Sequence, residues 1–395
     1  MLTRRDLLRA AAVVPASLVA RSSVTGAAYD LVIKGGRVID PGQRLDRVAD
    51  VAIRGGRVAA IRPGIAASEA ADVLDAVGKL VTPGLLDIHM HYDNPLVTPA
   101  HILSTGVTTS IEGGAYGADN IDEILAIARK APGRIRILVN LSRKGMAGNG
   151  ELLDIEDANV EAARRVIAQH RDWVVGLKLR VSKDAVGERD LEALRRARQV
   201  TDPFALPMMV HVGDTFSPMP AILALLRPGD IVTHMYTVLP NGIFDGQGRV
   251  LPEVLAARRR GVLFDIGHGR LGRISWETAT RGLEQRFPPD TITTDMSGPA
   301  LTDQVFDLPT VLSKFLLLGM PPDQVIACAT SRAARAIPAL RPYGSLRTGV
   351  TADVAVLELK EGEFEFVDNL KEKRVGRRKL VPHAVVFGGT RVSPG

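Results

Sequence analysis

The chain has few of the residues that mark disulfide-rich, nucleic-acid-binding or membrane-spanning proteins. Cys328 is its only cysteine, which excludes an internal disulfide, and its place in an apolar, helix-like stretch predicts a small buried residue. Aromatic residues make up only 4% of the 395 residues, which argues against the stacking platforms that bind single-stranded nucleic acid. No G-x-G-x-x-G motif opens a helix directly after a strand, so dinucleotide binding is unsupported as well.

An excess of charge of one sign is also largely missing once the amino terminus is set aside. Residues 1–28 carry four arginines and one aspartate, so this segment holds +3 of the total net charge of +6. The modest remainder predicts no nucleic acid or other polyanion as a partner. With 46% hydrophobic residues and a mean hydropathy of +0.08, the chain can bury a large core.

The first 28 residues look like a targeting segment. Arg4 and Arg5 are followed by an 11-residue run without charge, AAAVVPASLVA, and then by small residues up to Ala28. The run is shorter than the ~20 residues that span a membrane. The segment resembles a Tat-type signal peptide, which implies the Tat export machinery as a partner, a periplasmic or secreted location and no stable membrane insertion. The alternative is an ordinary amphipathic amino-terminal helix.

A repeated β pattern flanks the chain at both ends. The segments YDLVIKGGRVID and DVAIRGGRVAAI share a Gly-Gly-Arg-Val core at residues 35–38 and 55–58, and a looser copy, VVFGGTRV, spans 385–392. Each glycine pair lies between β-rich runs and is predicted to be a hairpin turn. We therefore predict one composite β-sandwich domain from residues 29–79 and 343–395.

Between these ends, apolar strands alternate with helical stretches. Eight strand–helix units over residues 80–342 predict an α/β fold, a (β/α)8 TIM barrel, with a doubly wound open sheet as the alternative. The eight candidate strands cover residues 80–91, 106–114, 134–140, 174–181, 207–213, 230–237, 261–269 and 291–297.

Side chains able to bind metal stand at the ends of several of these strands, where barrel active sites form. Two of them, His89 and His91, are one pleat apart on the same strand and so point the same way. Imidazole and carboxylate groups together suit zinc or a similar divalent ion. The full set is His89, His91, Lys178, His211, His234 and Asp295.

Each member of this set also has a plain structural explanation. His211 could be a hydrogen-bonded core residue, and Asp295 could cap the following helix. Lys178 is harder to explain in this way, because a charged amine in an apolar strand is costly when unpaired. Its neutral amine could instead react with CO₂ to form an anionic carbamate. The occurrence of all six at strand ends favours the metal interpretation.

In this order the residues resemble the amidohydrolase superfamily. The strand contexts PGLLDIHMH, GLKLRVS, PMMVHVGD, PGDIVTHMYT and TITTDMSG are also similar to its dihydroorotase-related deacetylase branch. The resemblance implies two divalent ions, with Zn²⁺ as the expected metal, bridged by carboxylated Lys178. One ion would be held by His89, His91 and Asp295, and the other by His211 and His234. A hydroxide shared by the ions would be the nucleophile, and Asp295 would transfer its proton.

Two residues depart from the family pattern. Dihydroorotases have an arginine two residues after the second histidine, where this chain has Asp93. The deacetylase branch often has a histidine two residues after the last aspartate, where this chain has Ser297. Both departures argue for a substrate different from those of the relatives.

Two further residues are candidate substrate contacts. Arg180 shares a strand face with Lys178 and could bind a substrate carboxylate, or could form an ion pair inside the barrel. His268 follows the seventh strand and could contact substrate, or could make a structural hydrogen bond.

We therefore predict a binuclear hydrolase that cleaves an amide or ester bond of a small molecule. The preferred reaction is deacetylation of a small N- or O-acylated carboxylate. A homo-oligomer is compatible with the sequence. The alternatives are a cyclic amide hydrolase, similar to dihydroorotase or hydantoinase, and a catalytically silent periplasmic binding protein.

Overall fold

The computed structural model describes residues 26–146, 150–303 and 307–392. The proposed signal peptide therefore lies, apart from its last three residues, outside the described part of the chain. Within that part, no helix is both long enough and apolar enough to cross a membrane.

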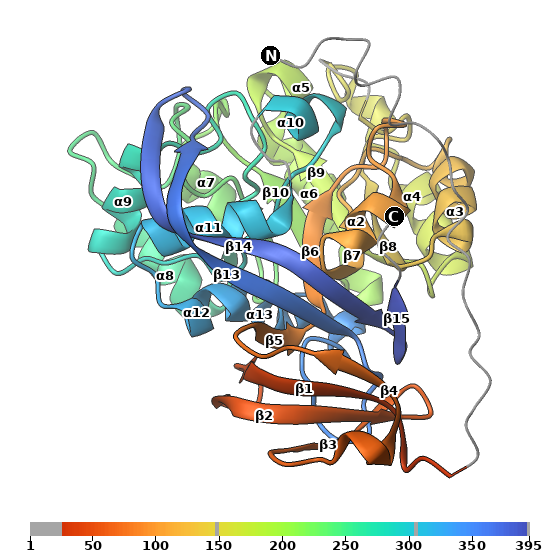
Figure 1. Ribbon diagram of the computed structural model, residues 1–395. Coiled ribbons are helices and arrows are strands. Elements are labelled where there is room, and N and C mark those ends of the chain that lie inside the picture. The colour runs from red at the N-terminus through yellow and green to blue at the C-terminus, as the bar shows by residue number, and fades with distance from the viewer. Residues whose placement is uncertain (1–25, 147–149, 304–306, 393–395) are drawn as a thin grey trace, which may run out of the picture.

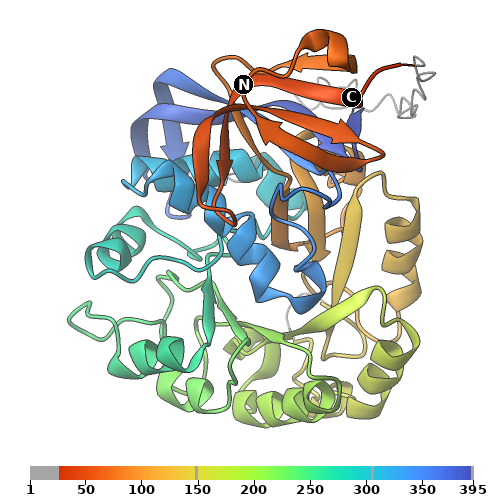
Figure 2. The ribbon, with the colours of Figure 1, turned by 90° about the horizontal axis from the view of Figure 1, so that it is seen from below.

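The barrel is built on a parallel seven-stranded sheet that curls around its axis (Figures 1 and 2). Its strands are consecutive in sequence and almost wholly buried, as expected for parallel strands covered on both faces. They are β6 (Leu85–Met90), β7 (Val107–Glu112), β8 (Arg134–Asn140), β9 (Val174–Arg180), β10 (Met208–His211), β11 (Ile231–Thr233) and β12 (Leu263–Asp265).

Amphipathic helices cover the outside of the barrel. In α3, acidic residues occupy the first turn and basic residues the last, which complements the helix dipole, while Ile124 and Leu125 are buried. The Asn159 side chain caps α4 by accepting from the Ala162 N–H. The helices between or after the strands are α2 (Pro99–Ser104), α3 (Ile121–Lys130), α4 (Val160–Gln169), α5 (Lys183–Val186), α6 (Asp190–Thr201), α7 (Met219–Ala224), α8 (Pro252–Arg260), α9 (Trp276–Glu284), α10 (Gly298–Asp303), α11 (Leu308–Leu317), α12 (Pro322–Cys328) and α13 (Ser331–Ala336).

The eighth predicted strand is not a regular strand, which corrects the sequence expectation for residues 291–297. Instead, single parallel bridges join Thr291 to Asp265 of β12 and Met296 to Met90 of β6. Backbone hydrogen bonds from His268 N to Thr293 O and from Asp295 N to His89 O add to these bridges. The segment therefore closes the ring between the first and last strands without ladder pairing.

The amino-terminal end of the barrel is closed by α13. One or two buried apolar residues from each of β6 to β11 pack with α13 in a single cluster, among them Ile88, Met209 and Ile231. This packing leaves the carboxyl ends of the strands for the polar site.

Both ends of the chain build a second, mixed sheet, which lies against one side of the barrel (Figure 2). In this sheet β5 is the join, because it pairs with β1 from the amino-terminal part and with β13 from the carboxyl-terminal part. The predicted fold class is thereby confirmed. The strands are β1 (Tyr29–Asp40), β2 (Leu45–Arg54), β3 (Arg57–Arg62), β4 (Ala70–Asp75), β5 (Leu80–Pro83), β13 (Val354–Val367), β14 (Lys373–Phe387) and β15 (Thr390–Val392).

Two of the three glycine pairs form the predicted hairpin turns, and the first does not. Gly55–Gly56 joins β2 to β3, and Gly388–Gly389 joins β14 to β15. Gly35 and Gly36, however, lie inside β1 at an irregularity in its pairing with β2. The Asp50 carboxylate accepts from Gly35 N, and a Cβ on Gly36 would lie 2.4 Å from a methyl carbon of Val81. Here glycine permits a β-bulge and close packing rather than a turn.

The hairpin of β13 and β14 extends beyond the sheet and crosses the barrel toward α9 (Figure 1). Leu380 N of β14 donates to Ser313 Oγ of α11, and the hairpin tip bonds to the start of α9 through Asp368, which accepts from Trp276 N. The carboxyl-terminal strands thus reach the edge of the polar site.

Candidate metal centre and active site

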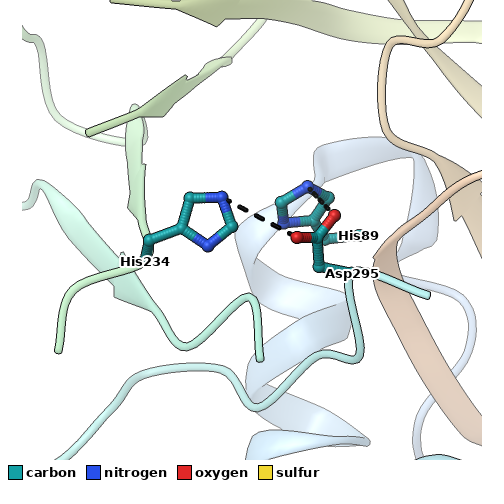
Figure 3. A group of neighbouring side chains, drawn as sticks. All are labelled: His89, His234 and Asp295. Carbon is teal, nitrogen blue, oxygen red and sulfur yellow. Dashed lines mark ion pairs between the residues drawn. The ribbon is translucent and has the colours of Figure 1, made fainter. Parts of the chain in front are cut away.

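Three of the predicted ligands form a compact group at the carboxyl ends of the barrel strands (Figure 3). The Nε2 atom of His89 is 3.4 Å from Oδ1 of Asp295, and the Nε2 atom of His234 is 4.0 Å from Oδ2 of Asp295. One ligand atom from each of the three lies within 4.8 Å of the others, which is the spacing of a metal site.

The other two predicted histidines join the same group. His91 Nε2 is 3.0 Å from Asp295 Oδ1, and His234 Nε2 is 3.1 Å from His211 Nδ1. The Nε2 atom of His211 is buried and has no hydrogen-bond partner among the described residues. An imidazole nitrogen without a partner in this position is a donor available to a metal ion.

Lys178 lies in the middle of the group. Its Nζ is 2.6 Å from His89 Nε2, and its side chain is buried. Burial lowers the pKa of Lys178 to about 8, although Asp295 and Glu112 act in the opposite direction. A substantial fraction of the amine is therefore neutral near pH 8, which is the form that can react with CO₂.

The Nδ1 atoms of three histidines are occupied by partners that orient the rings. His89 Nδ1 is 3.0 Å from Thr233 Oγ1, whose hydroxyl donates to Asp265 and so accepts from the ring. His234 Nδ1 donates to Gly267 O at 2.7 Å. His91 Nδ1 is 3.1 Å from Glu112 Oε1. Each ring consequently directs Nε2 toward the centre of the site, as in metal sites supported by outer hydrogen bonds.

The electrostatic environment keeps most of the imidazoles neutral. Burial and then Lys178 lower the pKa of His89 to about 4, and burial lowers the pKa values of His211 and His234 well below the usual range. Burial opposes protonation of His91 too, but hydrogen bonds with Asp295 and Glu112 raise its pKa to about 9. Although burial favours the protonated acid, the electrostatic interaction with His89 and the hydrogen bond with His91 hold the pKa of Asp295 well below its usual range.

Two site residues adopt the left-handed backbone conformation that is unfavourable for side chains other than glycine. His234 has φ of +65° and Asp295 has φ of +46°. Such strain persists only where the surroundings impose it, and it concentrates at functional sites. Around Asp295 the constraint comes from Asp87, which accepts from both the hydroxyl and the N–H of Thr294.

The site opens into a small cavity of about 170 Å³. This is below the ~300 Å³ at which typical ligand pockets begin, which indicates a small substrate. Two larger clefts, of about 510 and 550 Å³, contain none of the predicted ligands. The cavity is lined by His89, His91, Gly113, Gly114, Met146, Lys178, Arg180, His211, Arg270, Leu271, Arg273, Asp295 and Ser297.

The two candidate substrate contacts have different surroundings. Arg180 lines the cavity, but it also pairs with Glu151 at 3.2 Å and with Asp184 at 2.7 Å, which is the ion-pair alternative. His268 is fully buried and is not among the cavity-lining residues. Its Nε2 is 2.8 Å from Lys314 Nζ, so the geometry favours the structural alternative.

Several residues of the site had no distinguishing signal in the sequence. Glu112, Thr233 and Asp265 end ordinary strands, and only their position in the folded barrel places them behind the histidines. Arg270 and Arg273 lie in a loop after β12. The sequence contains many other arginines, so nothing in it distinguishes these two. Glu112 and Asp265 are lone carboxylates at the ends of apolar strands, but nothing in the sequence relates them to the histidines.

Comparisons with known proteins agree on one group of enzymes. No protein-family model matches the chain. It is 29% identical over 374 residues to a deacetylase of Enterococcus faecalis, covering 91% of this chain and 98% of that protein. The crystal structure of an adenine deaminase superposes with a TM-score of 0.84 at 29% identity, covering 92% of this chain and 99% of that one. A dihydroorotase structure gives 0.82 at 25% identity with the same coverage.

The similarity to a deacetylase, an adenine deaminase and a dihydroorotase over most of the chain supports the resemblance to the amidohydrolase superfamily. The predicted enzyme class is confirmed: the chain is a hydrolase related to enzymes that act on C–N bonds. The three relatives carry three different activity names, so similarity alone does not assign the substrate.

Proposed function

We propose that this hydrolase holds two divalent metal ions, zinc in the first instance, and hydrolyses an amide or ester bond of a small acylated carboxylate, with deacetylation as the preferred reaction. The observation that carries the proposal is the convergence of four imidazoles, the Lys178 amine and the Asp295 carboxylate at one cavity.

The donor set fits such a pair of ions. Zinc binds neutral imidazoles and carboxylates, so His91 would lose its proton when the ion binds. The buried Nε2 of His211 has no other partner among the described residues. One ion would be held by His89, His91 and Asp295, and the other by His211 and His234. Lys178 would join them as a carbamate. In forming it, the neutral amine nitrogen bonds to the carbon of CO₂ and releases one proton, leaving an anionic oxygen pair.

Bound divalent ions supply Lewis acidity and lower the pKa of water from 15.7 to roughly 7, which makes a nucleophile available at neutral pH. The chain's own residues then manage protons and orientation. Asp295 accepts the proton of the attacking water and donates it to the leaving nitrogen or oxygen. Its carboxylate is held for this task by His89 and His91.

Asp295 provides the test of this proton transfer. Replacing Asp295 with Asn keeps an oxygen ligand but removes the proton acceptor, so we expect turnover to be lost while most of the metal stays bound. Elemental analysis and steady-state rates measure the two effects separately. A near-normal rate in this variant would remove Asp295 from the mechanism.

Metal analysis of the purified protein tests the site itself. We expect about two ions per chain, loss of metal in Lys178→Ala, and partial restoration when short-chain carboxylic acids replace the missing carbamate. A screen of N-acyl amino acids, acetylated hydroxy acids and cyclic ureides then identifies the bond that is cleaved. A folded, stable protein that binds no metal would overturn the proposal.

A cyclic amide hydrolase is the second candidate, and the similarity to a dihydroorotase structure supports it. Against it, Asp93 replaces the arginine expected of dihydroorotases, and it is exposed and does not line the cavity. A silent binding protein would have no use for both Lys178 and Asp295. Hydrolysis of cyclic ureides in preference to acylated acids would favour the cyclic amide hydrolase over the deacetylase.

We also propose that residues 1–28 direct Tat-dependent export to the periplasm or beyond. Support comes from Arg4 and Arg5 and the short apolar run after them. Changing both arginines to lysine should retain the protein in the cytoplasm, as measured by fractionation. Unchanged export of that variant would exclude the Tat route.

A further inference from the structure

Two arginines of the loop between β12 and α9 line the cavity, and the proposed hydrolytic mechanism assigns them no role. Arg270 and Arg273 both border the space that contains Lys178 and Asp295. Nε of Arg270 and Nη1 of Arg273 are buried and, within the described parts of the chain, have no hydrogen-bond partner. A buried guanidinium donor without an acceptor is costly, so such groups are normally satisfied by protein, water or ligand.

The charges around the cavity also indicate that the two arginines bind an anion. Besides the proposed metal ligands, its lining contains three arginines, Arg180, Arg270 and Arg273, and no acidic side chain. Glu151 and Asp184 are bonded to Arg180, and Asp214 is bonded to Lys183. Among the described residues neither Arg270 nor Arg273 forms an ion pair, so both guanidinium groups are available to an anion from solution.

The loop that carries these arginines is fixed at both ends by the tip of the β13–β14 hairpin. Asn369 Nδ2 donates to Gly269 O at 3.2 Å, and Ile274 N donates to Asn369 Oδ1 at 3.2 Å. Gly272 O, in the middle of the loop, accepts from Val238 N at 3.0 Å. The arginines therefore project from an anchored backbone, which is how recognition residues are held for a ligand.

We propose that Arg270 and Arg273 form the subsite that binds the carboxylate of the substrate, and that they select acylated acids over neutral acylated molecules. The inference rests on the proposed function and transfers the acid-binding role from Arg180, which is already ion-paired, to this loop. A planar guanidinium matches a carboxylate through two parallel hydrogen bonds, which a neutral amide cannot reproduce.

Matched pairs of compounds test the subsite. Each pair is an N-acetyl amino acid and its carboxamide, which differ only in the negative charge. Binding is measured by calorimetry with metal-loaded protein in the Asp295→Asn background, so that turnover does not interfere. We expect acids to bind about 10- to 100-fold more tightly than their amides, in line with charged hydrogen bonds. Arg270→Gln and Arg273→Gln should each remove most of this advantage.

Arg259→Gln is the matched control, because Arg259 is exposed on α8 and is not a cavity residue. It should leave the acid preference unchanged. A purely structural role for the loop arginines would instead lower the urea midpoint of the ligand-free protein in Arg270→Gln and Arg273→Gln. We expect equal or higher midpoints, because each variant removes a half-buried guanidinium with one buried N–H group that lacks an acceptor.

The results separate this inference from the proposed function. Equal binding of acids and amides, no binding of either, or full acid preference in both arginine variants would overturn the subsite. Hydrolysis of acids and amides at equal rates by the metal-loaded wild type would overturn it while leaving the hydrolase intact. Acid-selective binding without hydrolysis of any compound by the wild type would overturn the hydrolase and leave the subsite.

Discussion

At the scale of single residues, the site depends on side chains that were visible in the sequence and on supports that were not. His89, Lys178 and Asp295 could be predicted because polar residues at the ends of apolar strands are unusual and chemically specific. Glu112 and Thr233 could not, since their role exists only once neighbouring strands place them against the histidine rings. The sequence therefore indicates the residues that could contact a ligand better than it indicates the residues that hydrogen-bond to them.

Gly114 offers a direct test of how Lys178 is placed. A Cβ on Gly114 would lie 2.4 Å from Lys178 Cβ and 2.5 Å from its Cγ. Gly114→Ala should therefore displace the lysine and lower metal content and turnover together, by at least about 10-fold, as for supporting residues of metal sites. Metal content per chain and rate on the best substrate of the screen measure this.

Gly319→Ala is the control for backbone strain. Gly114 and Gly319 have similar φ values, +94° and +90°, but nothing lies within 4 Å of a Cβ on Gly319. This variant should share the cost of positive φ while keeping metal and activity. Equal losses in both variants would mean that strain, rather than contact with Lys178, causes the effect.

At the scale of elements, the barrel strands and helices could be predicted and the closing segment could not. Strands such as β8 and β9 are continuous apolar runs, which identify buried parallel strands. Residues 291–297 are rich in threonine, and the hydroxyls of Thr291 and Thr293 donate to Asp265. In this segment, side-chain hydrogen bonds replace the backbone hydrogen bonds of a regular strand. No periodicity in the sequence predicts this replacement. The bulge at Gly35–Gly36 likewise depends on contacts with residues distant in the sequence, Asp50 and Val81.

The packing of the β13–β14 hairpin on α11 makes a prediction about pH. Lys314 of α11 is buried, donates to Val367 O and lies beside His268. Burial lowers its pKa from 10.5 to about 7, although Asp368 opposes the shift. Between pH 7 and pH 10 the unfolded chain therefore carries a proton that the folded chain lacks. The contribution of Lys314 to the free energy of unfolding must rise with pH in this window.

Urea titrations of wild type and Lys314→Met at pH 7.5, 8.5 and 9.5 measure that slope. The wild type should gain up to about 1.4 kcal/mol per pH unit relative to the variant, the limit for one proton. All other titrating groups are common to both proteins and cancel. Parallel stability curves for the two proteins would show that Lys314 stays charged in the folded state.

At the scale of the whole molecule, distant parts of the chain meet at the cavity. The sheet built from both termini could be predicted from the repeated β pattern, but the reach of its β13–β14 hairpin could not, because the hairpin contacts depend on how the sheet packs on the barrel. Through Asn369 the carboxyl-terminal strands fix the loop that carries Arg270 and Arg273. The proposed selection of substrates would thus depend on the terminal sheet.

The proposed ions would tie the same distant parts together, which predicts how metal removal affects stability. The ligands come from β9 and β10, from the ends of β6 and β11, and from the closing segment, so the unfolded chain cannot present them together. Binding to the folded state alone adds about 2.7 kcal/mol to the free energy of unfolding at a free metal concentration 100 times Kd. Urea unfolding at pH 7.5 with zinc or with a chelator measures the gain. His234→Ala should abolish it, whereas His101→Ala, an exposed histidine of α2, should retain it. Identical midpoints with zinc and with chelator in the wild type would contradict a metal centre built across the barrel.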